Sequence, residues 1–381
     1  MADWRVGVLN DIAHITMGQS PKGDTCNNHG EGTPLLNGPT EFGIRHPDPI
    51  QFTTDGKRFS KTGDILFCVR GSTTGRMNWG DQKYAIGRGI ASIRHKKGDD
   101  YRYFLRGILD FQLPLLLASA TGSTFPNVSK DQLHNLEIDI PPLEEQKEIA
   151  AVLASLDDKI DLLHRQNKTL EALAQTLFRH WFIDGAEDDW EEVALGEVVK
   201  TTSGGTPSRK KMEYYETGTI PWVKSKELNG SFIAETEEKI TEGALNSSSA
   251  KMLPRHSILI AMYGATVGEY GILTLPATCN QAICALLPNE SYPFTFLFMH
   301  IKNNKDELIN MAVGSAQQNI SQVLIKSLPI PKPTPRICEY HGQVEPIFSK
   351  IEANIGQIRT LEKLRDTLLP KLMSGEVRVR L

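Results

Sequence analysis

The chain has 381 residues, which is enough for about two to three domains of roughly 150 residues each. Its 40% hydrophobic and 23% charged residues are ordinary for a globular protein, and no apolar run approaches the roughly 18 residues of a membrane span. The net charge of −4 gives no global indication of nucleic-acid binding, and the opening residues lack the basic and apolar segments of a secretory signal. Five cysteines without a Cys-x-x-Cys pair argue against a disulfide framework and a thiolate zinc site, so we expect a cytoplasmic protein without a metal.

The sequence contains an internal repeat. The pattern Trp4-x4-Leu9 with Gly18-Gln19-Ser20-Pro21 recurs 186 residues later as Trp190-x4-Leu195 with Gly204-Gly205-Thr206-Pro207. The apolar run 64–69 and the turn 71–75 recur 193 residues later, at 257–262 and 264–268, and Thr169-Leu170-Glu171 recurs 191 residues later as Thr360-Leu361-Glu362. The chain is therefore predicted to be two copies of one module of about 190 residues.

The first mixed segment is expected to span residues 1–140. Its apolar runs 64–69 and 90–93 end at Gly or polar residues and predict strands, whereas residues 101–118 predict a helix disturbed at Pro114. Ser129 and Gln132 have the spacing of a capping box and predict a short helix that begins after Ser129.

A long helix is expected within residues 141–185, after the Pro-Pro junction. Apolar residues here step by four and three, which indicates a narrow seam for a partner helix rather than the broad apolar face of a surface helix. The seam comprises Ile149, Leu153, Leu156, Ile160, Leu163, Leu170 and Leu177. Asn167 lies in the same seam, where it either fixes the register or sits at an exposed edge. The alternative to a helix pair is a lone helix that packs on its own domain.

The second mixed segment, residues 186–330, repeats the order of the first. Residues 257–262 and 282–287 predict strands, and residues 294–312 predict a helix. Residues 331–381 then predict the second long helix, with the seam residues Ile347, Ile351, Ile358, Leu361 and Leu368 and a competing phase at Phe348 and Ile355. The expected fold class is mixed α/β (α+β), with two duplicated recognition domains separated by a long antiparallel two-helix coiled coil.

Charge is unevenly distributed along the chain. Residues 43–106 contain 13 Lys and Arg against 6 Asp and Glu, which favours contact with phosphates if these side chains share a face. Arg suits guanine, and Asn or Gln suits adenine, so Arg and Gln beside turns are candidates for base contacts. Asn280 and Gln281 abut a predicted strand, and we expect them to satisfy backbone groups instead. The candidate DNA-binding residues are Lys22, Arg45, Arg70, Thr73, Thr74, Arg76, Arg88, Lys210, Lys211, Lys224, Lys226, Tyr263, Thr266, Gln317 and Gln318.

Motifs for catalysis are missing from the sequence. The turns 71–75 and 264–268 are not followed by Gly-Lys-Ser/Thr, so they are not nucleotide-binding loops, and plain β-turns remain an alternative to DNA contacts. The sequence contains no His-Glu-x-x-His, no Gly-x-Ser-x-Gly and no methyltransferase Asn/Asp-Pro-Pro-aromatic tetrapeptide. We therefore predict no catalytic residues and no metal or cofactor in this chain.

Several motifs, taken in order on this duplicated frame, resemble the DNA specificity subunits of Type I restriction-modification systems. They are Ile140-Pro141-Pro142-Leu143-x2-Gln146, Leu156-Asp157-Asp158-Lys159-Ile160, Gly204-Gly205-Thr206-Pro207-Ser208, Cys279-Asn280-Gln281-Ala282 and the run from Leu368 to Gly375. The second junction departs from the family pattern, because Pro331-Lys332-Pro333-Thr334-Pro335 replaces the Pro-Pro-Leu-x2-Gln sequence.

The resemblance implies two target-recognition domains that each read one half of a split, asymmetric site in double-stranded DNA. It further implies two modification subunits that methylate adenine with S-adenosylmethionine, and restriction/translocase subunits that use ATP and Mg. The helical pair would act as spacer and as docking surface for the modification subunits, and no membrane is involved. A coiled-coil scaffold without sequence-specific DNA binding and a stand-alone DNA-modifying enzyme are the alternatives.

Overall fold

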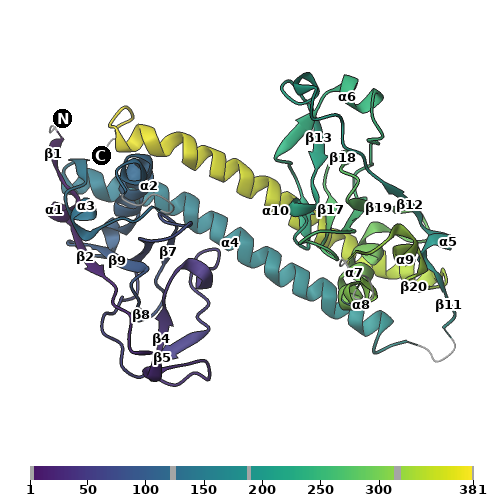
Figure 1. Ribbon diagram of the computed structural model, residues 1–381, viewed down its shortest axis with the longest axis horizontal. Helices are drawn as coiled ribbons and strands as arrows, with labels where there is room; N and C mark the ends of the chain where they lie inside the picture. The colour runs from purple at the N-terminus through teal and green to yellow at the C-terminus, as the bar shows by residue number, and fades with distance from the viewer. Residues whose placement is uncertain (1–3, 121–125, 187–189, 313–318, 380–381) are drawn as a thin grey trace. The chain divides into compact units, whose positions relative to one another are not determined.

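The computed structural model describes residues 4–120, 126–186, 190–312 and 319–379 (Figure 1). The chain forms two compact units, Met1–Leu162 with Arg359–Leu381 and Leu163–Ile358. Each unit contains one mixed α/β domain and segments of the same two long helices. The predicted fold class, two duplicated α/β domains with a long antiparallel helix pair, is confirmed.

The first domain is built on a four-stranded antiparallel sheet. Its strands, in spatial order, are β2 (Ala13–Met17), β9 (Ile90–His95), β6 (Ile65–Cys68) and β7 (Met77–Trp79). Ile65 pairs with Ile93 on one side and with Trp79 on the other, and β6 is buried along its whole length, as expected for a central strand with an uninterrupted apolar run. The two strands predicted in this domain are confirmed as β6 and β9.

A smaller sheet and three helices complete the first domain. The sheet contains β3 (Cys26–Asn27), β5 (Gln51–Thr53), β4 (Thr33–Leu36) and β8 (Ala85–Ile86), with β4 and β8 parallel. A separate ladder joins β1 (Arg5–Val8) to β10 (Glu137–Ile140). The helices are α1 (Leu9–Ile12), α2 (Arg102–Ala118) and α3 (Lys130–His134). α2 includes Pro114, and α3 begins at the predicted capping box, in which Ser129 Oγ accepts a hydrogen bond from the Gln132 backbone N–H.

The second domain repeats this plan. Its main sheet has the order β12 (Lys200–Ser203), β19 (Ile283–Leu287), β16 (Ile258–Ala261), β17 (Tyr270–Leu273) and β14 (Ser231–Ile233). The first four correspond to β2, β9, β6 and β7, and β14 adds a parallel edge strand. The smaller sheet contains β15 (Glu238–Ile240), β13 (Ile220–Val223) and β18 (Thr278–Cys279), and β11 (Glu192–Ala194) pairs with β20 (Pro329–Pro331). The strands predicted here are confirmed as β16 and β19.

One prediction for the second domain is wrong in detail. Residues 294–312 form two helices, α7 (Phe294–Asn303) and α8 (Lys305–Ala312), rather than one. The break is at Asn304, whose side-chain Nδ2 and backbone N–H both donate to the carbonyl of His300, at 2.9 and 3.0 Å. The side-chain amide therefore caps α7. The remaining helices are α5 (Leu195–Val198), α6 (Glu242–Asn246) and α9 (Gln322–Ser327).

The two Gly-x3-Gly turns have the same conformation in both domains. Gly75 and Gly268 have φ of 92° and 79°, and a Cβ at either would lie 2.6 Å from a side chain of the following helical segment, Leu113 or Ile309. Their N–H groups donate back to Cys68 and Ala261, at 2.8 and 2.9 Å. Each turn therefore requires glycine at this position, so that the chain can leave the central strand and return as the neighbouring strand.

The long helices α4 (Leu143–Phe182) and α10 (Pro335–Met373) pack antiparallel within each unit. In the first unit, the seam residues Ile149 and Leu153 of α4 share a core with Leu372 and Met373 at the far end of α10. Asp157 and Arg365 form an ion pair between the same helices, with Oδ1 and Nη1 3.0 Å apart.

In the second unit, Asn167 and Asn354 face each other, and Asn354 Nδ2 donates to Asn167 Oδ1 at 2.8 Å. Both residues are at most 8% exposed, so Asn167 is not at an exposed edge. Beyond this layer the buried positions include Ala174 and Phe178 of α4 and Tyr340, Val344 and Phe348 of α10. The predicted seam residues Leu170, Leu177 and Ile347 are only partly buried. Leu361 and Leu368 are also half-buried, whereas Leu156, Ile160, Leu163, Ile351 and Ile358 are buried.

The divergent second junction has a simple local explanation. α10 begins at Pro335, the last proline of the junction. A proline in the first turn of a helix loses no hydrogen bond, because that N–H has no partner within the helix, and its fixed φ suits the helix. The change at the junction therefore leaves the helix intact.

Candidate nucleic-acid interface

A groove of about 590 Å³ lies on the first domain, where the turn after β2 meets the ends of β6 and β8. Ser20 and Pro21 line it from the turn, and Arg70 and Arg88 from the strand ends. Both arginines are exposed, and the described lining residues contain no carboxylate. The groove therefore offers two guanidinium groups to an anionic or hydrogen-bonding ligand. The full lining is Ser20, Pro21, Gly23, Cys26, Asn37, Gly38, Gln51, Arg70, Arg88 and Gly89.

Backbone contacts explain the Gly-x-Ser/Thr-Pro turn beside this groove. The N–H groups of Gly18 and Gln19 donate to Ile90 and Ile86, at 2.9 and 2.8 Å, so the turn lies directly against the segment that carries Arg88. A Cβ at Gly18 would be 2.1 Å from the Gly87 carbonyl oxygen, and one at Gly204 in the second domain would be 2.0 Å from the Cys279 carbonyl oxygen. Only glycine permits so close an approach of two backbones.

The polar side chains of the groove are held from within the domain. Arg70 Nε donates to Asn127 Oδ1 at 3.3 Å, which leaves the rest of its guanidinium at the groove. Asn37 Nδ2 donates to Gln51 Oε1 at 3.0 Å. The Arg88 backbone N–H donates to Ser20 Oγ at 3.3 Å, and Arg88 itself is exposed.

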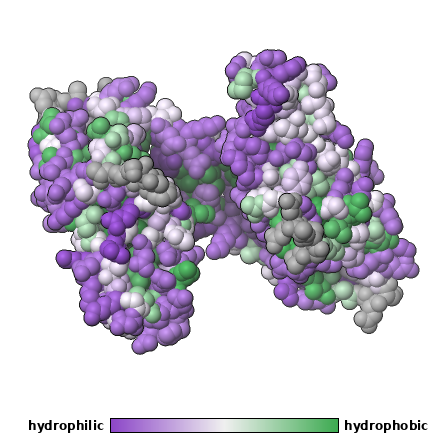
Figure 2. Space-filling view, viewed as in Figure 1, coloured by the Kyte–Doolittle hydropathy of each residue, from purple (hydrophilic) through white to green (hydrophobic). Residues whose placement is uncertain are grey.

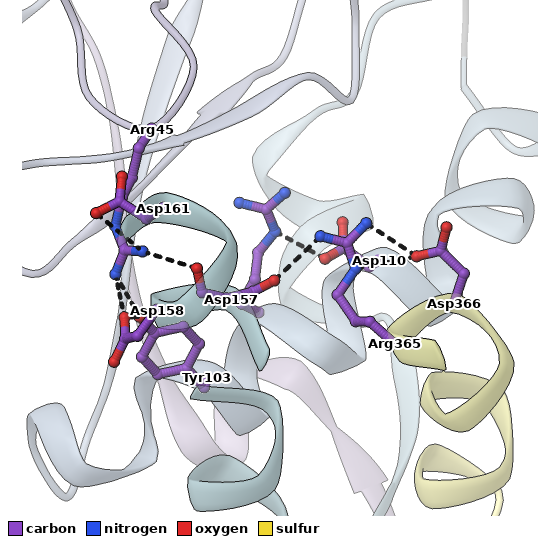
Figure 3. Close-up of polar contacts among 9 residues, drawn as sticks. Arg45, Tyr103, Asp110, Asp157, Asp158, Asp161, Arg365 and Asp366 are labelled. Atoms are coloured by element: carbon purple, nitrogen blue, oxygen red, sulfur yellow. Dashed lines mark hydrogen bonds and ion pairs between the residues drawn. The ribbon is translucent and has the colours of Figure 1, made fainter. Parts of the chain in front are cut away.

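Arg45 is bound to the helix α4 instead of facing the groove (Figure 3). Its Nη2 lies 2.5 Å from both Asp158 Oδ1 and the Tyr103 hydroxyl, and its side chain is only 17% exposed. Burial, aided by the Asp158 hydrogen bond, raises the pKa of Tyr103 to about 12, so this phenol stays protonated and can donate. The network holds the loop that carries Arg45 against α4.

The charged network continues across the first unit. Asp157 pairs with Arg365 of α10 (Figure 3). Within α2, Arg106 Nε donates to Asp110 Oδ2 at 2.8 Å. Burial raises the pKa of Asp110, although Arg106 and Arg365 oppose the shift. The Tyr103–Asp158 hydrogen bond joins α2 to α4, and the Asp157–Arg365 pair joins α4 to α10, so these contacts orient the domain on its own segments of the long helices.

Two further candidates in the first domain hold its loops. Arg76 donates from Nη2 to the Phe42 carbonyl at 2.7 Å and from Nη1 to the Pro39 carbonyl at 3.2 Å. Thr74 Oγ1 donates toward the carbonyls of Gly71 and Pro126, both at 2.8 Å. Thr73 and Lys22 are exposed, and Lys22 is flanked by the groove residues Pro21 and Gly23.

In the second domain, acidic neighbours neutralise much of the predicted basic cluster. Lys224 Nζ lies 2.7 Å from Glu237 and 2.8 Å from Glu238, and Lys226 also pairs with Glu237. Hydrogen bonds from these two lysines lower the pKa of Glu237 to about 2. Lys211 Nζ contacts the Tyr214 hydroxyl at 3.0 Å, and Lys210 is exposed.

The remaining candidates are placed as follows. Tyr263 is exposed next to its backbone bridge with Asn319, and Thr266 is half-buried in the turn. Gln317 and Gln318 lie outside the described residues.

The described ranges contain no group of three or more His, Cys, Asp or Glu side chains placed to hold a metal ion. Burial raises the pKa of the Cys279 and Cys284 thiols to about 12, so these cysteines are unreactive packing residues. Among the described helices, none combines the length and apolar character needed to cross a membrane.

Comparison with known proteins identifies the family. The model of the Type I restriction modification DNA specificity domain matches residues 1–172 and, a second time, residues 187–356. The chain belongs to this family. The family's domain is therefore present twice in this chain, which accounts for its duplicated architecture.

Individual relatives match this chain over about two thirds to nearly all of its length. The MjaIX specificity subunit of Methanocaldococcus jannaschii is 29% identical, over 99% of this chain and 94% of the relative. The HindI specificity subunit of Haemophilus influenzae is 26% identical, over 69% of this chain and 73% of the relative. The solved S subunit of a Type I system from M. genitalium has the same fold, with a TM-score of 0.64 and 18% identity over 97% of this chain and 96% of that one.

Gln146 of the Pro-Pro-Leu-x2-Gln sequence has a structural role in this Type I specificity protein. Gln146, in the Pro-Pro-Leu-x2-Gln sequence, is buried, and its Nε2 donates to the Pro141 carbonyl at 2.8 Å. Its Oε1 lies 3.2 Å from His95 Nε2, and His95 Nδ1 accepts from the Lys97 N–H. The glutamine therefore ties the start of α4 to the end of β9.

Sequence reasoning missed two polar residues of the groove and assigned a third polar residue, Gln281, to backbone contacts. Asn37 and Gln51 line the groove, and Gln281 is exposed in the second domain with its Oε1 in contact with Thr206 Oγ1. The prediction that Asn280 serves the backbone is confirmed, because its Oδ1 accepts from the Ala282 N–H at 3.1 Å. Gln281 does not do so in the described structure. The repeat itself was the available signal, since it aligns Gln281 with Arg88.

Proposed function

We propose that this chain is the noncatalytic DNA-sequence-recognition subunit of a Type I restriction-modification complex. It binds a bipartite, asymmetric site in double-stranded DNA, one recognition domain per half-site. The helix pair serves as spacer and as docking surface for two modification (methyltransferase) subunits, and restriction/translocase subunits join that assembly. S-adenosylmethionine, ATP and Mg belong to those partners, which supply the catalysis.

One observation is the main support for DNA recognition by both domains. The Gly-x-Ser/Thr-Pro turn and the strand end beside it form the same backbone arrangement in each domain, but the side chains exposed there differ. The Gly-x-Ser/Thr-Pro turn packs against the same strand end in each domain. In the first domain this place has Arg70 and Arg88, and in the second it has Tyr263 and Gln281. A repeated frame with different polar groups suits two readers of different half-sites, because base-edge contacts decide which sequence is read.

Two exposed leucines support the docking part. Leu173 of α4 and Leu364 of α10 are 46% and 45% exposed, and they occupy the same position of the helical repeat. Figure 2 shows a mostly hydrophilic surface on the face in view, with hydrophobic residues in small groups. α4 also exposes Leu143 and Leu162, whose repeat counterparts are Thr334 and Ala353. Leu173 and Leu364 are thus the exposed leucines that the repeat matches, as suits one modification subunit per repeat.

The net charge of −4 supports the idea that partner subunits supply much of the DNA affinity of the complex. Phosphate contacts dominate nonspecific DNA affinity, so the lone chain is expected to bind DNA weakly and with strong salt dependence. Tight, specific binding requires the modification subunits.

An exchange of recognition domains tests the proposal. Replacing residues 190–328 with the corresponding segment of a relative should change one half of the methylated site and leave the other half unchanged. The measurement is methylome sequencing of a host that expresses the chimera with its modification subunit, with the parent chain as control. A change in both halves would contradict one domain per half-site, and the absence of any sequence-specific methylation from the parent complex would favour a scaffold without DNA recognition.

A further inference from the structure

The two recognition domains can be aligned residue by residue through their parallel strand pairs. In the first, Leu36 of β4 pairs with Ile86 of β8, and in the second, Val223 of β13 pairs with Cys279 of β18. Four positions separate Ile86 from Ile90, the first residue of β9, and four separate Cys279 from Ile283, the first residue of β19. Arg88 and Gln281 therefore occupy the same position.

The Gly-x-Ser/Thr-Pro turn contacts this position in both domains, although through different atoms. The hydroxyl of the Gly-x-Ser/Thr-Pro turn contacts it each time, through Ser20 Oγ to the Arg88 N–H and through Thr206 Oγ1 to the Gln281 side chain. Both residues are exposed. In both domains the turn therefore lies beside this position, and the exposed side chain there differs between the domains.

The two side chains remain available to a ligand. In the described structure, the Arg88 guanidinium has no hydrogen bond or ion pair to the rest of the chain. Gln281 shares its Oε1 with the Thr206 hydroxyl, and its Nε2 donors have no partner among the described residues. When the hydroxyl donates to Oε1, the amide still presents a donor and an acceptor side by side.

These groups match different bases. A guanidinium donates two parallel hydrogen bonds, which suits the O6 and N7 acceptors of guanine, whereas a carboxamide offers one donor and one acceptor, which suits N7 and N6 of adenine. Two other basic candidates are already engaged, because Arg76 holds the Phe42 carbonyl and Lys224 pairs with Glu237 and Glu238. Arg70 also lines the groove, but its counterpart Tyr263 cannot form a bidentate pair with a base edge.

We propose that positions 88 and 281 are the corresponding specificity-determining residues of the two domains, with Arg88 reading a guanine and Gln281 an adenine. The inference rests on the proposed function, because it assumes that these domains read DNA. It further states which residue reads which base, and it predicts that exchanging the two residues changes the bases that are read.

The test uses the full chain assembled with its modification subunits. Arg88→Gln should change one position in one half of the methylated site from guanine to adenine, and Gln281→Arg should make the converse change in the other half. Binding to a duplex with the original base should weaken by about 10- to 100-fold in each variant. Methylome sequencing and equilibrium competition between duplexes that differ at single positions provide the two readouts.

A matched control removes the same charge elsewhere in the domain. Arg58 is exposed and outside the groove lining, so Arg58→Gln should leave every recognised base unchanged. Unaltered thermal unfolding and unaltered copurification of modification subunits should show that each variant is folded.

The outcomes separate this inference from the proposed function. If Arg88→Gln and Gln281→Arg complexes keep the parental bases, or lose affinity equally for all sequences, the assignment of these positions is wrong while DNA reading stands. If the parent complex itself shows no sequence preference, the proposed function fails, and the assignment fails with it.

Discussion

His95 and His300 are buried residues that make the stability of the two units depend on pH. His300 Nε2 lies 3.0 Å from the Pro329 carbonyl and donates to it, and His95 is fixed between Gln146 and the Lys97 N–H. Burial lowers the pKa of each to about 4, because the charged imidazolium is poorly solvated inside the protein.

The sign of the effect follows from proton linkage. Between about pH 6.5 and 4 the unfolded chain binds protons at these histidines and the folded chain does not, so the free energy of unfolding falls as the pH falls. From pH 7 to 5 we expect a loss of about 2 kcal/mol for each buried histidine. Urea unfolding of His300→Gln should show a correspondingly smaller loss over this range, and the exposed His180→Gln should behave as the parent. Equal pH dependence in parent and His300→Gln would contradict the assignment.

At the residue scale, the sequence could indicate the type of a side chain but not its direction. Arg45 lies in a basic stretch with the residues of the groove, yet it extends to Asp158 of α4, more than 100 positions away in the sequence. Such a contact depends on how the loop packs, which neither charge counting nor periodicity reports. The places of Arg70 and Arg88 at strand ends were predictable, in contrast, because Arg70 directly follows the predicted strand 64–69 and Arg88 lies just before the predicted strand 90–93.

At the scale of elements, the buried Asn167–Asn354 layer breaks the symmetry of the helical repeat. The shift of 191 residues aligns Asn167 with Ile358 and Asn354 with Leu163. Because the helices are antiparallel and Asn167 faces Asn354, Leu163 lies level with Ile358. Pairing α4 with α4 of a second chain would place Asn167 opposite Leu163, with its amide unsatisfied. The layer thus favours α4 with α10, as a single polar seam residue does in other coiled coils.

Substitutions at this layer should separate stability from pairing specificity. Asn354→Leu alone leaves the Asn167 amide without its partner and should lower the free energy of unfolding by about 1–3 kcal/mol. The double variant Asn167→Ile with Asn354→Leu restores an apolar layer and should unfold at a higher temperature than the parent, but it should self-associate as concentration rises. Thermal unfolding and sedimentation velocity measure the two effects. A strictly monomeric double variant would show that the amide pair does not select the partner helix.

Helix periodicity predicted the pair of long helices but not where its seam shifts. An a/d pattern repeats every 3.5 residues while a straight helix turns every 3.6, so the buried face drifts along the helix. In α4 the seam position Ala174 is buried as the periodicity predicts, but beyond it Phe178 and Phe182 are buried instead of Leu177. There the ring of Phe178 meets those of Phe296 and Tyr340. The domain that packs against this end selects the aromatic residues, and only the tertiary structure supplies that partner.

At the scale of the whole molecule, the proposed spacer converts helix length into distance between half-sites. The facing asparagines give the register needed to lengthen it without disturbing the layers. One heptad inserted between Leu163 and His164, and its partner heptad between Gln357 and Ile358, places the two added segments level with each other. Leu163 then stays level with Ile358, and Asn167 stays opposite Asn354. Each insertion extends its helix by about 10 Å.

The recognised bases in each half should remain the same, while the unread gap between them grows by about three base pairs, at roughly 3.4 Å per base pair of B-DNA. Affinity should fall somewhat, because the added base pairs also rotate one half-site around the duplex axis. Methylome sequencing of a host that expresses the expanded chain with its modification subunit measures the gap directly. A single insertion in α4 alone is the matched control: it displaces every layer on one side of the insertion and should abolish assembly. If the doubly expanded chain folds, assembles and still methylates the original spacing, then the modification subunits set the distance and the helix pair does not.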